Sequence, residues 1–123
     1  MANEITIGVN LSFSKSGTSE SFKVASATDT MAGTDYVKGT QQVPTSSPDG
    51  GAALGLGGIT TPGYLMIVNN DSSNPVDIKN GTGGAVVARV DPGMPAAFQL
   101  ATTTPWVVAT GGVVEIEYLL IEA

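Results

Sequence analysis

The N-terminal segment alternates between apolar and polar side chains from residue 3 to residue 13. Because successive side chains of a β-strand point to opposite faces, this pattern predicts a strand with one buried face. The turn-prone residues 15–18 and a second alternation over 21–25 predict that this strand continues into an antiparallel hairpin. One short helical turn between Gly17 and Gly33 stays open, because that stretch lacks Gly and Pro but carries no helical stripe. The apolar residues of the first strand are Ile5, Ile7, Val9, Leu11 and Phe13.

The second half of the chain consists of short apolar segments separated by turn residues. Strand starts recur at intervals of about ten residues, which is typical of an antiparallel sandwich or barrel and not of alternating strands and helices. Asn80-Gly81 and Pro92-Gly93 are the clearest turns, because glycine adopts the positive φ that tight hairpin turns and type II turns require. We therefore predict an all-β fold, an antiparallel β-sandwich of about eight to ten short strands. The apolar segments are 63–69, 76–79, 85–90, 96–100, 106–109 and 113–121.

Composition favours one globular β domain over residues 1–123. The 123 residues include 16 Gly and 7 Pro and only 13% are charged, a mixture that disfavours helices and favours turns. The 41% hydrophobic content is too high for a disordered chain, yet no apolar run approaches the ~20 residues of a membrane-spanning helix. The Gly-, Ser- and Pro-rich segment 45–58 is expected to form a long ordered loop, in which Leu54 and Leu56 can pair weakly with a strand.

The amino acids that the chain lacks exclude most catalytic chemistry. Without Cys or His there is no disulfide, thiolate nucleophile, imidazole base, zinc finger or Ser-His-Asp triad. The net charge of −6 repels nucleic acid phosphates and anionic lipids, so neither nucleic acid nor a membrane is an expected partner. The first residues lack the basic and apolar regions of a secretory signal, so we expect synthesis in a cytoplasm. We expect no enzyme activity and no cofactor.

Two groups of oxygen-bearing residues could still carry chemistry, and each has a plainer explanation. Glu115 and Glu117 lie on one strand face and could serve a carboxylate hydrolase, but like charges on an exposed sheet face usually only interact with solvent. The segment Asn69–Asp77 is rich in calcium-type ligands but lacks the residue order of a calcium loop. Asn, Asp and Ser also form turns by bonding to their own backbone, which is the interpretation we favour. We expect no metal site.

The aromatic residues raise the question of carbohydrate binding, which uses exposed rings. Trp106 and Tyr64 are the candidate ligand-facing aromatics, with Tyr36 and Tyr118 as further rings. A single Trp that follows Pro105 at a strand start is more often an anchor of the core or of an interface. Trp106 and a Tyr on one open surface would favour sugar binding, whereas buried rings would favour a structural role.

The C-terminal strand is apolar on both faces. Even-numbered residues from Val114 to Leu120 form one apolar face, whereas the other face places Glu115 and Glu117 beside further apolar groups. Such a strand is usually central and covered on both sides, either by the rest of its own chain or by another subunit. The sequence is compatible with cover by its own chain and with cover by another subunit. The candidate subunit interface consists of Val113, Leu119 and Ile121.

Several motifs in the second half resemble those of small virion proteins of tailed bacteriophages. They are the run 58–65 with its Thr-Pro-Gly-Tyr, the turns 68–71 and 74–78, the Pro92-Gly93 turn before the strand 96–100, and the acidic strand 114–118. The likeness covers residues 58–123, and the first half matches only in its opening residues and its strand-rich style. Because the motifs are turn and core features, the resemblance indicates a fold and a virion setting and no particular site.

The resemblance implies a compact β-sandwich of jelly-roll type that acts in the virion as a head decoration (cement) protein or other minor structural protein. Its implied partners are further copies of itself, as a trimer, and the major capsid protein or other virion proteins. The absence of catalytic groups, the low charge and the two-sided last strand agree with this role. The alternative is a receptor- or carbohydrate-binding β-sandwich module of a phage tail or fibre. A carboxylate hydrolase is the third possibility.

Overall fold

The computed structural model describes residues 4–46, 50–81 and 83–122, which form ten β-strands and no helix. The predicted all-β fold is therefore confirmed. Among these residues no helix is present that has the length and apolarity of a membrane span. The chain divides into two compact units, Met1–Ala32 and Gly33–Ala123. The sequence predicts one β-sandwich over residues 1–123, but the sandwich lies in the second unit, and the first unit is a hairpin.

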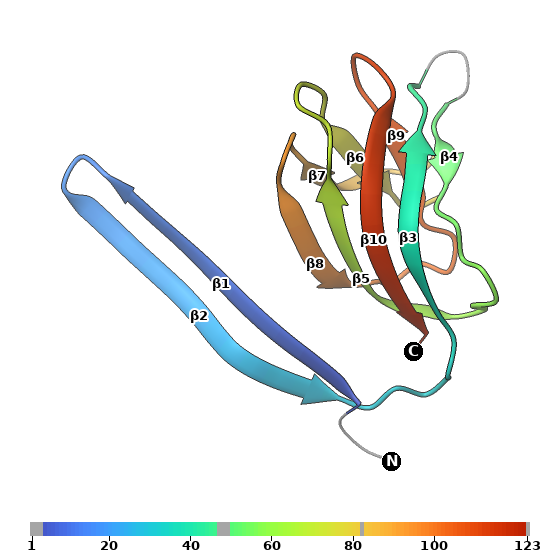
Figure 1. Cartoon of the computed structure of the whole chain (residues 1–123), viewed down its shortest axis with the longest axis horizontal. Coiled ribbons are helices and arrows are strands. Elements are labelled where there is room, and N and C mark those ends of the chain that lie inside the picture. Colours follow the sequence, from blue (N-terminus) through green and yellow to red (C-terminus); the bar gives the residue numbers. More distant parts are fainter. Residues whose placement is uncertain (1–3, 47–49, 82, 123) are drawn as a thin grey trace. The chain divides into compact units, whose positions relative to one another are not determined.

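The first unit is a long antiparallel hairpin of β1 (Ile5–Lys15) and β2 (Thr18–Asp29) (Figure 1). Its two-residue turn has positive φ at Ser16 (53°) and Gly17 (81°), the geometry of the hairpin turn whose twist matches the flanking strands. The predicted hairpin is thus confirmed, and the residues after Gly17 form a strand, not a helical turn. A bulge between Ile7 and Val9 increases the local twist.

The prediction that the alternating face of the first strand is buried is wrong for the single chain. Val9, Leu11 and Phe13 are 50%, 76% and 56% exposed, Ile7 is half-buried, and only Ile5 is buried. The alternation correctly places these side chains on one face. Burial also needs a second layer, which a two-stranded unit does not contain.

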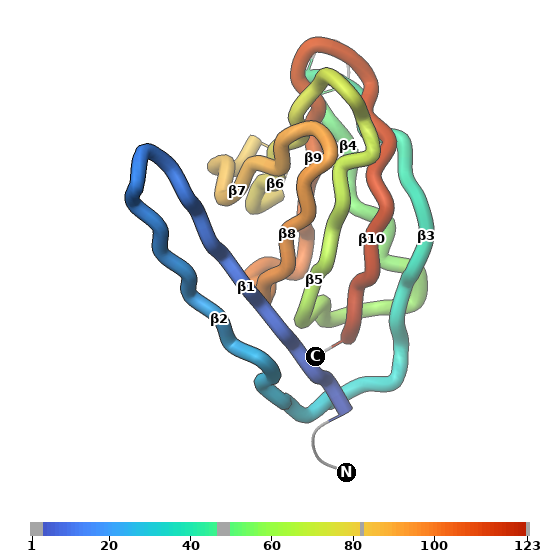
Figure 2. The backbone as a smooth tube through the Cα atoms, turned by 60° about the vertical axis from the view of Figure 1, so that its left-hand side comes forward, coloured from blue at the N-terminus to red at the C-terminus, as the bar shows by residue number. Residues whose placement is uncertain are grey.

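The second unit is a sandwich of two four-stranded antiparallel sheets around one core (Figures 1 and 2). One sheet has the order β3 (Tyr36–Val43), β10 (Val114–Glu122), β5 (Pro62–Asn69), β8 (Pro95–Gln99). The other has the order β4 (Ala52–Ala53), β9 (Trp106–Ala109), β6 (Val76–Lys79), β7 (Val86–Val90). The first strand of the sandwich therefore pairs with the last, the second with the second last, and so on to β6 with β7. Successive pairs alternate between the two sheets.

The sequence-predicted strands of the second half occur within one or two residues of their expected positions. Gly81 and Gly93 have the predicted positive φ of 98° and 76°. The amide of Met94 donates to the carbonyl of Asp91 at 3.0 Å and closes a turn with Pro92-Gly93 at its centre. The strand β3 was not predicted, because its sequence alternates only weakly and contains Gly39.

The core lies between the two sheets and confirms one face of the last strand. Val114, Ile116, Tyr118 and Leu120 are at most 6% exposed, and β10 is central, paired with β3 on one side and β5 on the other. Burial of these apolar and aromatic side chains is the main stabilising contribution to the fold. Further core residues are Val43, Leu54, Ile59, Leu65, Ile67, Val76, Ile78, Val90, Val107 and Ala109.

The glycine-rich segment after residue 50 is attached to the sandwich by side chains. The hydroxyl of Tyr118 donates to the carbonyl of Gly55 at 2.9 Å, and Gln41 bonds both the Ala53 carbonyl and the Gly55 amide at 2.9 Å. Leu54 inserts into the core between these bonds. Of the loop predicted over 45–58, residues 47–49 lie outside the described residues, and the rest contains the short strand β4 (Ala52–Ala53).

Candidate functional site

The outer face of the sheet β3-β10-β5-β8 is the surface that points away from the core. Registers across the sheet place Tyr36, Ile121 and Tyr64 in one row and Lys38, Leu119 and Met66 in the next. The third row runs from Thr40 through Glu117 and Val68 to Pro95. Most of these side chains are apolar, although the face has no layer above it within the unit. We call the residues of these rows, with Ala97 and Gln99 of β8, the outer sheet face.

The outer sheet face is open to solvent at its centre and at one edge. Tyr36 is 66% exposed and Met66 is 49% exposed, while Leu119 and Ile121 are half-buried by their neighbours in the sheet. A shallow depression of about 280 Å³ lies here, lined by Lys38, Met66, Val68, Glu117, Tyr118 and Leu119. Two of the three predicted interface residues therefore lie together on this face. The third, Val113, precedes β10 and is 57% exposed.

The hairpin presents a second apolar surface. Cross-strand pairs place Val9 opposite Val24 and Leu11 opposite Phe22, and Phe13 follows on the same face. Phe22 is 78% exposed and Val24 is 44% exposed. The opposite face is polar, with the pairs Asn10 with Lys23, Ser12 with Ser21, and Ser14 with Ser19. We call the set Val9, Leu11, Phe13, Phe22 and Val24 the hairpin stripe.

The two glutamates considered for catalysis do not line a common depression. Glu115 and Glu117 are exposed, and their neighbours across the strands are Gln42 for the first and Thr40 and Val68 for the second. A glycosidase needs two carboxyl groups that converge across a cleft, with one of them in an apolar environment that raises its pKa. Glu117 lines the shallow depression of the outer sheet face, and Glu115 is not among the residues of that lining.

The segment Asn69–Asp77 uses its side chains to build a turn. Asn69 is fully buried; its amide group donates to the carbonyls of Asn74 (2.9 Å) and Val90 (3.0 Å), and its side-chain oxygen accepts the amide of Asp71 at 2.8 Å. Asp71 in turn accepts the amides of Ser73 and Asn74 at 2.9 and 2.7 Å. Within the described ranges no group of three or more acidic residues could hold a metal ion. These bonds match the favoured turn interpretation.

Asp77, the last residue of that segment, is bonded to a strand neighbour. Arg89 donates from two nitrogens to the two carboxylate oxygens of Asp77, at 2.7 and 3.1 Å. This bidentate geometry is the strongest form of a charged side-chain pair. The hydrogen bond and the charge of Asp77 raise the pKa of Arg89, and the nearly buried carboxylate is satisfied by its partner.

The candidate ligand-facing aromatics do not share a surface. Trp106 lies on β9 and Tyr64 on β5, which belong to different sheets. The indole nitrogen of Trp106 donates to the Gly50 carbonyl at 2.7 Å, so this half-buried ring anchors the loop before β4. Tyr118 is buried, and burial raises the pKa of its hydroxyl. Tyr64 instead shares the outer sheet face with Tyr36, with Ile121 between them.

Sequence reasoning missed a hydrogen-bonded carboxylate at the end of the last strand. Glu122 accepts the backbone amides of Thr34, Asp35 and Thr60 and the Thr60 hydroxyl, at 3.3 to 3.4 Å. The bonds from Thr60 and Asp35 contribute most to lowering the pKa of Glu122 below its ordinary value of 4.5. A Cβ atom on Gly33 would overlap this carboxylate, so a side chain at this position would displace the carboxylate from its present place. The cluster joins three distant segments and was not visible as a local motif.

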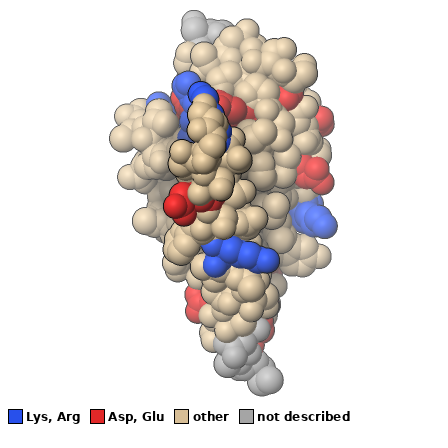
Figure 3. All heavy atoms as spheres, turned by 90° about the vertical axis from the view of Figure 1, so that its left-hand side faces the viewer, with Lys and Arg blue, Asp and Glu red and all other residues tan. Residues whose placement is uncertain are grey.

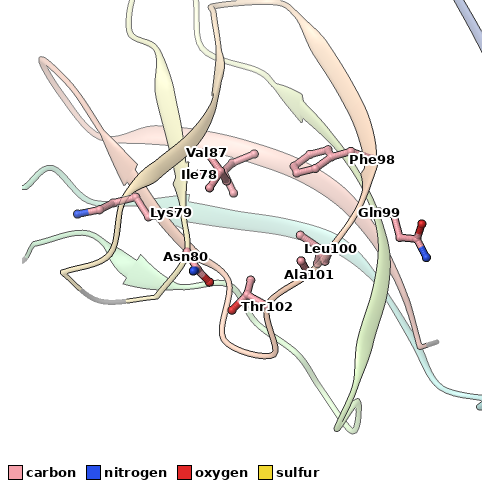
Figure 4. Close-up of a pocket in the computed structure, with 9 residues that line it drawn as sticks. All are labelled: Ile78, Lys79, Asn80, Val87, Phe98, Gln99, Leu100, Ala101 and Thr102. Carbon is pink, nitrogen blue, oxygen red and sulfur yellow. The ribbon is translucent and has the colours of Figure 1, made fainter.

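A further cavity of about 230 Å³ lies where the edge strands β7 and β8 leave the side of the sandwich open. Figure 4 shows Phe98 and Val87 pointing toward each other across it, whereas Lys79 and Gln99 point away. The interior is formed by aliphatic and aromatic groups, with Asn80 and Thr102 at the rim. Lys79 is the one charged residue of this lining, and its side chain points away from the cavity.

Comparison of the chain with protein-family models, with curated proteins and with solved structures finds no match. Function is therefore inferred from the strand order, from the two apolar surfaces and from the sequence motifs of residues 58–123. Uncharged residues make up most of the surface seen in Figure 3, where charged side chains form small separate groups. Such a surface suits contacts with other proteins better than contacts with a strongly charged polymer.

Proposed function

We propose that this chain is a non-enzymatic structural protein of a bacteriophage virion, a capsid decoration (cement) protein that binds across neighbouring shell subunits and associates with itself. The observation that carries the proposal is the pair of uncovered apolar surfaces, the outer sheet face and the hairpin stripe. Exposed apolar surfaces of this extent mark protein contacts. The likeness of residues 58–123 to small phage virion proteins supplies the setting.

The strand order supports the same proposal. Eight strands whose pairs β3/β10, β4/β9, β5/β8 and β6/β7 alternate between two sheets correspond to one long hairpin rolled up on itself. We propose to assign this arrangement to the jelly roll, a fold that viral capsid proteins use and that lectins also use. Because one fold serves different functions, the strand order supports a virion role together with the apolar surfaces and not by itself.

The proposed mechanism is mechanical. A cement protein buries its apolar surfaces against adjacent shell subunits, so that separating those subunits also requires breaking the contacts of the cement. Because the contacts repeat with the symmetry of the shell, modest energies at each site add up to a large resistance to expansion or rupture. Such a protein needs a rigid fold and apolar contact surfaces, and it needs no active site.

Imaging of intact particles that carry the chain tests the proposal. The expected result is density for the sandwich at every symmetry-related position of the shell, and particles that lack the chain should rupture at lower temperature than complete particles. Density at the tail or fibre, or particles of unchanged thermal resistance, would contradict the cement role.

The alternative, a carbohydrate-binding module of a tail or fibre, has one observation in its favour. Tyr36 and Tyr64 flank Ile121 on the outer sheet face, where rings could stack on a sugar. The carbohydrate-binding alternative also predicts that Trp106 takes part in the site, but Trp106 lies on the other sheet. Titration with host-surface oligosaccharides, with Tyr36→Ala as the comparison, distinguishes the two functions: the cement role predicts no binding by either protein.

A further inference from the structure

We propose that the β1–β2 hairpin is an exchange arm: its stripe packs on the outer sheet face of a second copy of this chain. The proposal rests on the self-association part of the proposed function and is independent of the virion setting. It joins the two uncovered apolar surfaces of the molecule in a single type of contact.

The hairpin needs a partner because a two-stranded sheet by itself is only marginally stable in water. The residues of the hairpin stripe are 44% to 78% exposed in the single chain. Polar Ser, Asn and Lys pairs occupy the other face, so only one face of the ribbon requires cover. The alternation of the sequence thus produces an apolar face that the two strands of the hairpin cannot bury by themselves.

The outer sheet face is a matching acceptor in shape and chemistry. Two β faces pack when each offers a layer of apolar side chains, with the sheets about 10 Å apart. The rows that contain Ile121, Leu119 and Val68 provide such a layer, and Met66 at its centre is the flexible side chain that adapts best to an incoming surface.

Charge does not oppose the contact. Residues 33–123 contain eight acidic and three basic residues, a net charge of −5, so two sandwiches repel each other. The hairpin face that carries the stripe has Lys15 and Glu20, whose charges balance, whereas Lys23 lies on the polar face. This neutral face therefore meets the glutamates of β10 without adding repulsion.

A contact in which the arm of one copy packs on the sheet of the next copy is head-to-tail. Such a contact forms a ring if the rotation between copies closes and an open chain of copies if it does not.

The absence of cysteine from the chain allows a clean test. Two full-length variants, Leu11→Cys and Met66→Cys, are mixed and treated with a short bis-maleimide reagent. The proposal expects a cross-linked dimer that contains one chain of each kind, and it expects Ser12→Cys, on the polar face of the hairpin, to give far less product with Met66→Cys. An internal cross-link, seen as a product of monomer mass in the double variant Leu11→Cys/Met66→Cys, would overturn the proposal. Cross-linked dimers that form only between two Leu11→Cys chains would also overturn it.

Sedimentation measures the energetic consequence. The double variant Leu11→Asn/Phe22→Asn should weaken self-association at least tenfold, whereas Ser12→Asn/Ser21→Asn, the neighbouring pair on the polar face, should leave it unchanged. Circular dichroism confirms that both variants keep their β structure. A wild type that is monomeric overturns the arm together with the self-association part of the proposed function. An oligomer that is insensitive to the stripe variant overturns the arm alone.

Discussion

The carboxylate of Glu122, near the end of the last strand, accepts hydrogen bonds from both the amide and the hydroxyl of Thr60, 62 residues earlier in the chain. The same carboxylate binds the amides of Thr34 and Asp35, where the chain enters the sandwich. One side chain therefore holds together the beginning of the sandwich, the loop before β5 and the end of β10. An ionised carboxylate is a stronger acceptor than a protonated one, so these contacts depend on pH.

Acid should weaken the sandwich through Glu122. Its folded-state pKa is below the ordinary value of 4.5, so its stabilising contribution is complete above that value and is lost as the pH falls through the folded-state pKa. Glu122→Gln should therefore lower the melting temperature at neutral pH, and the difference from wild type should shrink in acid. Thermal unfolding across this pH range measures the effect. The control is Glu115→Gln on the exposed face, and equal pH profiles for wild type and Glu122→Gln would contradict the role.

Asn69→Ala should be strongly destabilising. The substitution removes a buried hydrogen bond to the Val90 carbonyl and a partly buried one to the Asn74 carbonyl, and it leaves both carbonyl groups without these donors. A cost of about 2–4 kcal/mol in the free energy of unfolding is expected. Urea denaturation followed by the fluorescence of the single Trp measures it. Asn70→Ala, at an exposed position, should cost less than about 0.5 kcal/mol, and similar values for both variants would refute the role of Asn69.

Calcium and chelators should leave the melting temperature unchanged. The side-chain oxygens of Asn69 and Asp71 accept amides of their own loop, and those of Asp77 accept Arg89, so these groups are already engaged. Differential scanning fluorimetry with added calcium and with a chelator provides the measurement. A specific rise of several degrees with calcium would show that the loop is a metal site after all.

Two adjacent leucines of β10 should differ sharply in their contribution to stability. Leu120 is fully buried in the core, whereas Leu119 is half-buried on the outer sheet face. Leu120→Ala should cost about 2–5 kcal/mol in the free energy of unfolding, because it leaves a cavity. Leu119→Ala should cost less than about 1 kcal/mol in the dissociated monomer. Urea denaturation at low protein concentration compares the two variants. A larger loss of stability for Leu119→Ala than for Leu120→Ala would show that Leu119, and not Leu120, faces the core.

Local sequence determined the strands, the turns and the sharing of faces in this protein. The alternation of β1 and the apolar core face of β10 are properties of neighbouring residues, because the side chains of a strand point alternately to its two faces. The same holds for the turns at Gly81 and Gly93, where a positive φ suits glycine. These features need no knowledge of what the chain packs against.

Tertiary structure decided which faces are covered and which distant residues meet. Alternation places Leu11 and Phe13 on one face but cannot say whether a second layer lies over them, and in the single chain both are exposed. Trp106 and Tyr64 were candidates for one site, yet the strand order assigns them to different sheets. Glu122 is an ordinary acidic residue in the sequence, and its role arises because sheet pairing and loops bring amides from residues 34, 35 and 60 to one carboxylate. Such contacts join segments far apart in the chain, and no short-range pattern encodes them.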